Sequence, residues 1–182
     1  MSVDLPAALP GGPRSLRTCF LVGAPRCGTT FLAKALARHP DVCFSKPKET
    51  HFFVRDAAAI PPERWAGEFL ARYFGSLDAR HTLIAEGSPL QLRDPDAIER
   101  ILHFDPEARF VVAIRNPIEM IHSFHARLVY LLDEDERDFE QAWLLQTKRA
   151  QGERIPRRCR DPRSLQYREM ASLGTQDRKS VV

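Results

Sequence analysis

The sequence has few cysteines and no long hydrophobic run, and each absence excludes a class of protein. The four cysteines among its 182 residues include no CxxC pair, which excludes a zinc ribbon and a thioredoxin motif. No apolar run approaches the roughly 20 residues that a membrane-spanning helix needs. The first 15 residues lack the basic and apolar parts of a secretory signal. We therefore expect a cytoplasmic protein without membrane contacts, whose free thiols are Cys19, Cys27, Cys43 and Cys159.

An excess of charge of one sign is lacking too. Lysine and arginine number 27 against 24 acidic residues, and this net charge of +3 is too mild to predict nucleic-acid binding. The six histidines show neither HExxH nor HxH spacing, so no metal site is predicted. A chain of this length, with 43% hydrophobic and 28% charged residues, is typical of one globular domain. The oligomeric state stays open.

Short apolar segments alternate with helical patterns along the chain. Alternation of this kind predicts βαβ units and a parallel sheet. The expected fold class is therefore α/β, a P-loop-like three-layer fold whose central parallel sheet is flanked by helices. Strands are predicted at 18–23, 42–44, 82–86 and 109–114, and helices at 31–39, 62–74, 95–104, 117–131, 138–150 and 164–174.

The apolar spacing also predicts which side chains face the core. Residues 109–114 are nearly all apolar, as a central parallel strand should be. The Trp65, Phe69 and Tyr73 stripe is interpreted as core packing rather than as a platform for stacked bases. Asp94 and Asn116 should cap their helices, and Gly174 should end the last one. The predicted inner faces are Phe31, Leu32, Ala35 and Leu36 in one helix, and Ile118, Ile121, Phe124, Leu128 and Leu131 in another.

The two ends of the chain differ from its middle. Residues 1–15 hold three prolines and two glycines and are expected to form a flexible lead-in to a domain at 16–176. Because a parallel sheet usually needs more elements to cover both faces, we interpret the chain as a partial domain, or its last residues, 177–182, as non-native. The five arginines within 154–163 form a solvated basic face or guide an anionic acceptor such as a glycan.

A glycine-bearing turn joins the first predicted strand to the first helix. The turn runs from Gly23 to Thr30 and matches the GxxxxG part of a Walker A loop. Backbone N–H groups from Arg26 to Thr30 can wrap an anion, and the helix N-terminus adds about half a positive charge. The alternative is a plain strand–helix turn that binds nothing.

This turn has Thr29 where a Walker A loop has its lysine. An NTPase uses that lysine at the β- and γ-phosphates, together with Mg²⁺ held by an Asp. The strand at 109–114 runs into Arg115, and the strand at 82–86 ends in Glu86, so neither ends in Asp. The pattern therefore favours a ligand with fewer consecutive phosphates than Mg-ATP.

A second anion site is predicted after residues 109–114. Arg115 follows the strand at its C-terminal end, where open α/β sheets bind ligands. Ser123 lies between one and two turns into the next helix, so the two side chains could grip one phosphate. The alternative is that Arg115 pairs with a surface carboxylate and that Ser123 is ordinary helix surface.

Together these motifs resemble a known family. VGAPRCGTTFLAKAL, HPDVCFSKPKETHFF, EGSP and VVAIRNPIEMIHSF follow one another between residues 17 and 130. In this order they resemble the sulfotransferases that use 3′-phosphoadenosine 5′-phosphosulfate, in the bacterial and heparan-sulfate-like branch. The resemblance implies sulfuryl transfer to a hydroxyl or amine of a carbohydrate or small molecule, without a metal ion.

The resemblance also implies roles for individual residues. The family's 5′-phosphosulfate loop falls on Pro25, Arg26, Cys27, Gly28, Thr29 and Thr30, and its 3′-phosphate site on Arg115 and Ser123. The acidic base falls on Glu49, and Arg26 would neutralise charge on the transferred group. The chain departs from the family at Arg26 and Gly87, where members often have lysine, and in its lack of a visible C-terminal loop over the nucleotide.

Several side chains near the predicted base keep two interpretations. Glu49 is the general base, or a solvated carboxylate paired with Lys46 or Lys48. His51 is an alternative base, or a packed and hydrogen-bonded histidine. Lys48 touches the sulfate or lies at the surface, and Cys27 is interpreted as a spacer rather than a nucleophile.

Two rival functions remain on the sequence alone. A P-loop kinase or NTPase predicts dependence on Mg-ATP, and the missing lysine counts against it. A remnant that binds adenosine 3′,5′-bisphosphate without turnover is supported by the short C-terminal part.

Overall fold

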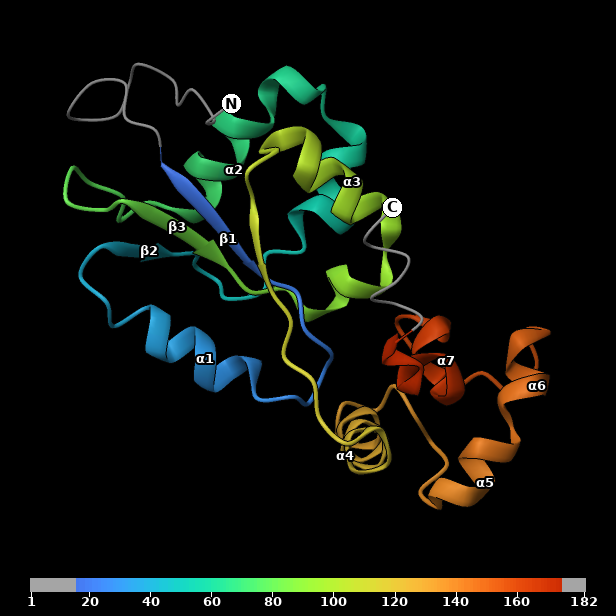
Figure 1. The fold of residues 1–182 in the computed structure, drawn as a ribbon. Helices are drawn as coiled ribbons and strands as arrows, with labels where there is room; N and C mark the ends of the chain where they lie inside the picture. Colours follow the sequence, from blue (N-terminus) through green and yellow to red (C-terminus); the bar gives the residue numbers. More distant parts are fainter. Residues whose placement is uncertain (1–15, 175–182) are drawn as a thin grey trace. The chain divides into compact units, whose positions relative to one another are not determined.

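The computed structural model describes residues 16–174 and divides into two units, the first ending at Ala113 and the second beginning at Ile114. The predicted lead-in, 1–15, and tail, 177–182, lie outside the described residues, as does the domain boundary at 176. Figure 1 shows the elements of each unit.

Four short parallel strands form the sheet of the first unit (Figure 1). Their order is β2-β3-β1-β4, so β1 lies between β3 and β4. Because the strands are parallel, the segments that follow them emerge at one edge of the sheet, where open α/β sheets bind ligands. The strands are β1 (Arg17–Leu21), β2 (Val42–Phe44), β3 (Leu83–Glu86) and β4 (Arg109–Val111).

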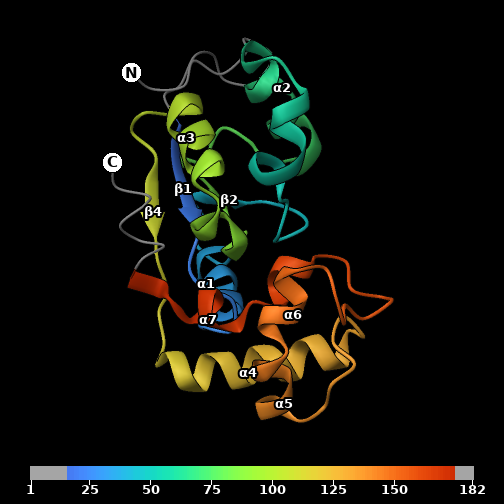
Figure 2. The same ribbon diagram turned by 90° about the vertical axis from the view of Figure 1, so that its right-hand side faces the viewer.

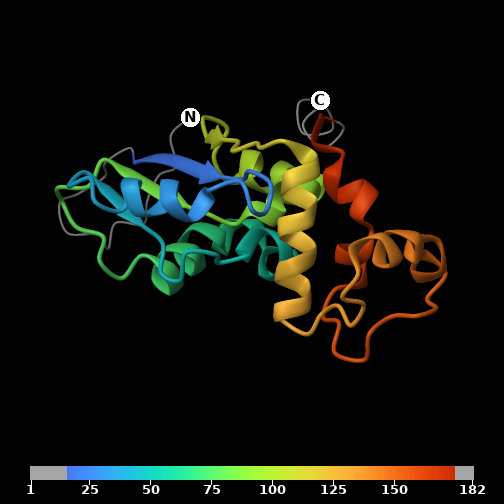
Figure 3. The same cartoon turned by 90° about the horizontal axis from the view of Figure 1, so that it is seen from below.

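Helices cover both faces of this sheet, which confirms the predicted α/β three-layer class. Successive side chains of a strand point to opposite faces, so Phe20 packs on one side of β1 and Leu21 on the other. Figure 3 shows α1 on one face and α2 and α3 on the other. These helices are α1 (Thr29–Leu36), α2 (Trp65–Tyr73) and α3 (Pro95–Phe104).

The side with α2 and α3 holds an aromatic core. Phe69 is 1% exposed, and its ring lies 5.1–5.2 Å from the rings of Phe52 and Phe53. The indole N–H of Trp65 donates to the carbonyl oxygens of Ala57 and Ile60. The Trp65, Phe69 and Tyr73 stripe is therefore core packing, as predicted. Short turns of 3-10 or π-helix span Phe52–Asp56, Ala57–Ala59, Pro62–Arg64, Pro89–Arg93 and Pro162–Leu165.

Two predictions about the first unit are wrong. The predicted face of α1 is wrong at Phe31, which is 76% exposed, although Leu32 and Leu36 pack against the core beside the buried Ala33. The segment 109–114 is not a central strand, since β4 contains only three of its residues and lies at the sheet edge. Val111 and Val112 are exposed there, because no further strand pairs with β4 among residues 16–174.

A close backbone approach at Gly23 gives a first prediction. A Cβ atom placed at Gly23 would lie 2.3 Å from the backbone nitrogen of Ala113, so Gly23→Ala should lower the unfolding free energy by about 1–3 kcal/mol. Gly67, inside α2, has no atom within 4 Å of such a position. Gly67→Ala should instead raise it by about 0.5–1 kcal/mol. Urea denaturation measures both, and equal effects would contradict the assigned packing.

The second unit is helical, and its longest helix is α4 (Figure 2). Asn116 caps it by accepting hydrogen bonds from the N–H groups of Ile118 and Glu119. Glu134, which follows α4 in the chain, forms a fully buried ion pair with Arg149, and the Tyr167 hydroxyl donates a hydrogen bond to Glu134. The helices are α4 (Pro117–Tyr130), α5 (Phe139–Leu144), α6 (Gln146–Ala150) and α7 (Tyr167–Ala171).

Three predictions about the helices of this unit need correction. The helix predicted at 138–150 is two helices that break at Leu145. The one predicted at 164–174 is a 3-10 turn followed by α7, whose C-cap is Ser172 instead of Gly174. On α4, Ile118 is 68% exposed, and the buried face includes Met120 and His125.

The arginine-rich segment 154–163 also belongs to the second unit. Arg160 pairs with Asp133 through contacts as short as 2.5 Å, and Arg163 pairs with Asp161. Two of its five arginines thus have carboxylate partners within their own unit. A role in guiding an anionic acceptor stays a prediction.

Candidate functional site

The predicted phosphate loop directly follows β1 and leads into α1. Gly28 has a φ of +83°, a left-handed conformation that glycine adopts without steric cost. Its carbonyl oxygen accepts hydrogen bonds from the N–H groups of Phe31 and Leu32, which begins the helix. The N–H groups of a helix's first turn have no partner within the helix, so those of Thr29 and Thr30 can serve an anion.

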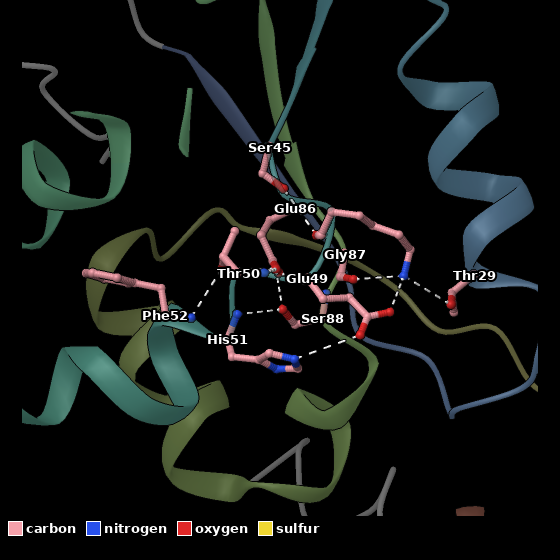
Figure 4. A network of polar contacts seen from close by, with 10 residues as sticks. Thr29, Ser45, Glu49, Thr50, His51, Phe52, Glu86, Gly87 and Ser88 are labelled. Atoms are coloured by element: carbon pink, nitrogen blue, oxygen red, sulfur yellow. Dashed lines mark hydrogen bonds and ion pairs between the residues drawn. The ribbon is translucent and has the colours of Figure 1, made fainter. Parts of the chain in front are cut away.

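Lys48 connects this loop with the segment that follows β2, and Figure 4 labels its partners Thr29, Glu49 and Gly87. Its Nζ atom donates to Glu49 Oε1 at 2.8 Å, to the Gly87 carbonyl oxygen at 3.1 Å and to Thr29 Oγ1 at 3.5 Å. The structure therefore brings together the ends of β1, β2 and β3. Of the two interpretations of Glu49, its pairing with Lys48 is the arrangement seen in the structure.

Glu49, the charged partner of Lys48, is partly exposed to solvent. Its side chain is 47% exposed, and its second oxygen lies 3.8 Å from His51 Nε2. A carboxylate that is exposed and held from one side can still accept a proton from an incoming hydroxyl. The geometry is compatible with the predicted base, and the assignment stays a prediction.

His51 lies beside Glu49 in a strained backbone conformation, with a φ of +53°. Burial, together with the nearby positive charges of Arg55 and Lys48, lowers the pKa of His51, although Glu49 opposes them. Its Nδ1 atom is buried and has no hydrogen-bond partner among the described residues. Burial and these positive charges thus favour the uncharged form of the imidazole.

Glu86 supports this segment through hydrogen bonds, a role that the sequence did not reveal (Figure 4). It is 1% exposed and ends β3. Its carboxylate accepts hydrogen bonds from both the N–H and the hydroxyl of Thr50, and from both the N–H and the hydroxyl of Ser88. Burial raises the pKa of Glu86, and these four donors oppose that shift. The sequence signal for this role is an acidic residue at the end of an otherwise apolar strand.

Ser88 carries this support to His51. Its hydroxyl donates to Glu86 and accepts a hydrogen bond from the backbone N–H of His51 at 3.0 Å. Thr50 acts in the same way, since its hydroxyl accepts from the N–H of Phe52 at 3.2 Å. The backbone from 50 to 52 is thus fixed to the end of β3.

The sequence of this chain is similar to those of several curated sulfotransferases. No protein-family model matches the chain. It is 31% identical over 127 residues to heparan sulfate glucosamine 3-O-sulfotransferase 6 of Mus musculus, covering 68% of this chain and 34% of that protein. It is 25% identical over 112 residues to membrane-associated sulfotransferase kil1 of Dictyostelium discoideum, covering 61% and 23%. The chain is related to the sulfotransferases.

The fold agrees with this relationship. The crystal structure of a sulfotransferase from Alicyclobacillus acidocaldarius superposes with a TM-score of 0.73 at 22% identity, over 92% of this chain and 69% of that one. The fold class expected from the sequence is therefore confirmed, and the curated relatives agree with the resemblance to sulfotransferases. The chain spans only about a quarter to a third of the length of the curated sulfotransferases that it matches.

The remaining residues predicted for a sulfotransferase site lie in the second unit. Arg115 precedes α4 and pairs with Glu119 at 2.8 Å, so the alternative of a surface carboxylate partner is what the structure shows. Ser123 lies on α4 and is half-buried. Their assignment to a 3′-phosphate stays a prediction.

None of the four cysteines, all within the described residues, forms a disulfide, and the Cys27 thiol donates to the carbonyl oxygen of Pro25 at 3.5 Å. Between residues 16 and 174, no three His, Cys, Asp or Glu side chains gather closely enough to hold a metal ion. In the same part of the chain, no helix has the length and apolar character to cross a membrane.

Proposed function

We propose that the chain transfers a sulfuryl group from 3′-phosphoadenosine 5′-phosphosulfate to a hydroxyl or amine of a carbohydrate or small molecule. The observation that carries the proposal is the meeting of the phosphate loop with Lys48, Glu49 and His51 at one sheet edge. The relationship to carbohydrate sulfotransferases supports it. A cytoplasmic location belongs to the same proposal.

The reaction requires little covalent work from the protein. The acceptor oxygen or nitrogen forms a bond to sulfur, while the bond between sulfur and the bridging oxygen breaks and adenosine 3′,5′-bisphosphate leaves. Glu49 takes the proton of the acceptor. Arg26, with the N–H and hydroxyl groups of Thr29 and Thr30, holds the 5′-phosphosulfate and stabilises its charge.

The donor also defines the expected binding residues. Pro25, Cys27 and Gly28 would shape the loop so that its backbone N–H groups face the anion. Arg115 and Ser123 would hold the 3′-phosphate, because a guanidinium and a hydroxyl together suit a phosphate dianion. His51 would be the second candidate for the base. The donor is a substrate, and no metal ion is part of the proposal.

The rival functions make different binding predictions. A kinase or NTPase would bind Mg-ATP, and a remnant would bind the bisphosphate without transfer. Thermal shift measurements with adenosine 3′,5′-bisphosphate and with ATP, each with and without Mg²⁺, separate the nucleotide classes, because tight binding stabilises the native state by mass action. We expect the bisphosphate to raise the melting temperature without Mg²⁺. A shift with Mg-ATP alone would reject the proposal.

The predicted 3′-phosphate site gives a second mutational prediction. Arg115→Ala should weaken binding of adenosine 3′,5′-bisphosphate by about tenfold or more, the value of one charge-assisted hydrogen bond. It should hardly change the affinity for adenosine 5′-monophosphate, which lacks the 3′-phosphate. Calorimetric titration measures both, with the exposed Arg127→Ala of α4 as the control. Equal losses for the two nucleotides would remove Arg115 from this role.

A further inference from the structure

An ammonium group lies against the phosphate loop, although the loop itself contains no lysine. Lys48 comes from the segment after β2 and places Nζ 3.5 Å from Thr29 Oγ1, at the first residue of α1. Thr29 is 5% exposed, and it holds the position where the GxxxxGK pattern has its lysine. A cation from a distant segment therefore reaches the place where the loop sequence lacks one.

Hydrogen bonds hold both the backbone and the side chain of Lys48 in place. Its carbonyl oxygen accepts hydrogen bonds at 3.2 Å from the N–H of Gly87 and from the hydroxyl of Ser45. Its Nζ atom donates back to the carbonyl oxygen of Gly87 at 3.1 Å. The side chain is thus held at the end of β3 and does not extend freely into solvent.

Gly87 makes room for this arrangement. A Cβ atom at Gly87 would lie 3.2 Å from Phe44 Cζ, and 3.6 Å from both Cγ and Cε of Lys48. The aliphatic part of the lysine therefore runs over the glycine in van der Waals contact. A larger side chain at 87 would compete with Lys48 for the same space.

The Lys48 ammonium has Glu49 as its charged partner, at 2.8 Å. Glu49 is the proposed base, so this ion pair occupies one of its two carboxylate oxygens. An anionic group bound on the phosphate loop would offer the same ammonium a second, more highly charged partner. The two anions would then compete for one lysine.

We propose that Lys48 binds the 5′-anionic group of the nucleotide and that this binding releases Glu49 from its ion pair. The inference rests on the proposed function and deepens it. When the donor is bound, the Lys48 ammonium stabilises the charge on the transferred group and the bridging oxygen. The Glu49 carboxylate then accepts the proton of the acceptor. Donor binding thus prepares the base at the same site.

The first test measures nucleotide affinity by calorimetry. Lys48→Met retains the aliphatic part over Gly87 and removes the charge, and Lys46→Met is its control on the same loop, because Lys46 is exposed. We expect Lys48→Met to weaken binding of adenosine 3′,5′-bisphosphate by about 10- to 100-fold. Lys48→Arg should restore part of the loss, and adenosine 3′-monophosphate, which lacks the 5′-group, should show no difference between the variants.

The outcomes separate this inference from the proposed function. If the unmodified chain binds no adenosine 3′,5′-bisphosphate, the proposed function fails. If the unmodified chain binds it, and Lys48→Met binds it as well as Lys46→Met does, only the inference is overturned. An equal loss with adenosine 3′-monophosphate would also overturn it, because Lys48 would then act on the fold instead of on the 5′-anion.

The second test examines the competition between the two anions. Glu49→Gln removes the charge that competes for Lys48, so the affinity for adenosine 3′,5′-bisphosphate should rise by roughly 1.5- to 5-fold, the worth of an exposed ion pair. In Lys48→Met, the same substitution should have no effect. An affinity that stays equal or falls in Glu49→Gln would overturn the release of the base.

Discussion

Glu49→Gln should lower the rate of sulfuryl transfer by about 10²- to 10⁴-fold, the usual contribution of a general base. Glutamine retains the size of the side chain, but its amide cannot accept the proton of the acceptor. The affinity for the nucleotide should not fall, because the loss concerns proton transfer rather than donor binding. Transfer of ³⁵S from the labelled donor measures the rate, and calorimetry measures the affinity.

A matched control for this substitution is Glu63→Gln. Glu63 is an exposed acid of the same unit, in the 3-10 turn before α2. It should leave the transfer rate unchanged. If Glu49→Gln retained the unmodified rate, Glu49 would not be the base, and His51→Gln would then be the variant to examine, because His51 lies 3.8 Å from Glu49.

Glu86→Gln should lower the free energy of unfolding by about 2–4 kcal/mol, because a buried donor left without an acceptor costs roughly 1–3 kcal/mol. The carboxylate accepts hydrogen bonds from four groups of Thr50 and Ser88. The amide of glutamine has only one oxygen, so its NH₂ group would face N–H or O–H donors. The effect concerns the first unit, which contains these residues.

The measurement can be restricted to the first unit, because each unit contains one tryptophan. Trp65 belongs to α2 and Trp143 to α5, so the fluorescence of a Trp143→Phe background follows the unfolding of the first unit. Glu99→Gln, an exposed acid on α3, is the control. If Glu86→Gln and Glu99→Gln had the same small effect, the hydrogen bonds to Glu86 would not support the site as described.

Elements with strong local signals could be predicted from the sequence. The helix predicted from Asp94 through Phe104 forms at those residues, and the Asp94 side chain accepts a hydrogen bond from the N–H of Ala97. A capping residue followed by proline constrains the backbone within one turn. The strand at 42–44 and the glycine-bearing turn before α1 also depend on local patterns, and both form where the sequence predicts them.

Predictions failed where neighbouring segments decide the outcome. The apolar run 109–114 indicated a central strand, but hydrophobicity alone cannot tell which strands will pair on either side, and β4 lies at an edge. Phe31 was assigned to the core by spacing, yet the inner face of α1 includes Thr29 and Ala33. Helical periodicity predicts that a helix has one apolar side more reliably than it predicts which residues of that side face the core.

In the candidate site, too, local motifs could be predicted from the sequence and contacts between distant segments could not. The residue types of the phosphate loop and of the Lys48–His51 segment could be recognised, because each forms a short contiguous motif. The contact between Lys48 and Thr29 could not, since it joins residues 19 positions apart. The support from Glu86 to Thr50 joins residues 36 positions apart. Such contacts follow from the pairing of the strands, which brings their carboxyl ends together.

The central claim is that this chain binds a sulfuryl donor at the edge of its sheet and transfers the sulfuryl group. The most direct measurement incubates the protein with ³⁵S-labelled 3′-phosphoadenosine 5′-phosphosulfate and a panel of carbohydrate hydroxyls and amines, without Mg²⁺. We expect label to move to an acceptor and adenosine 3′,5′-bisphosphate to inhibit this transfer. Binding of the donor with no transfer of label to any acceptor would contradict it.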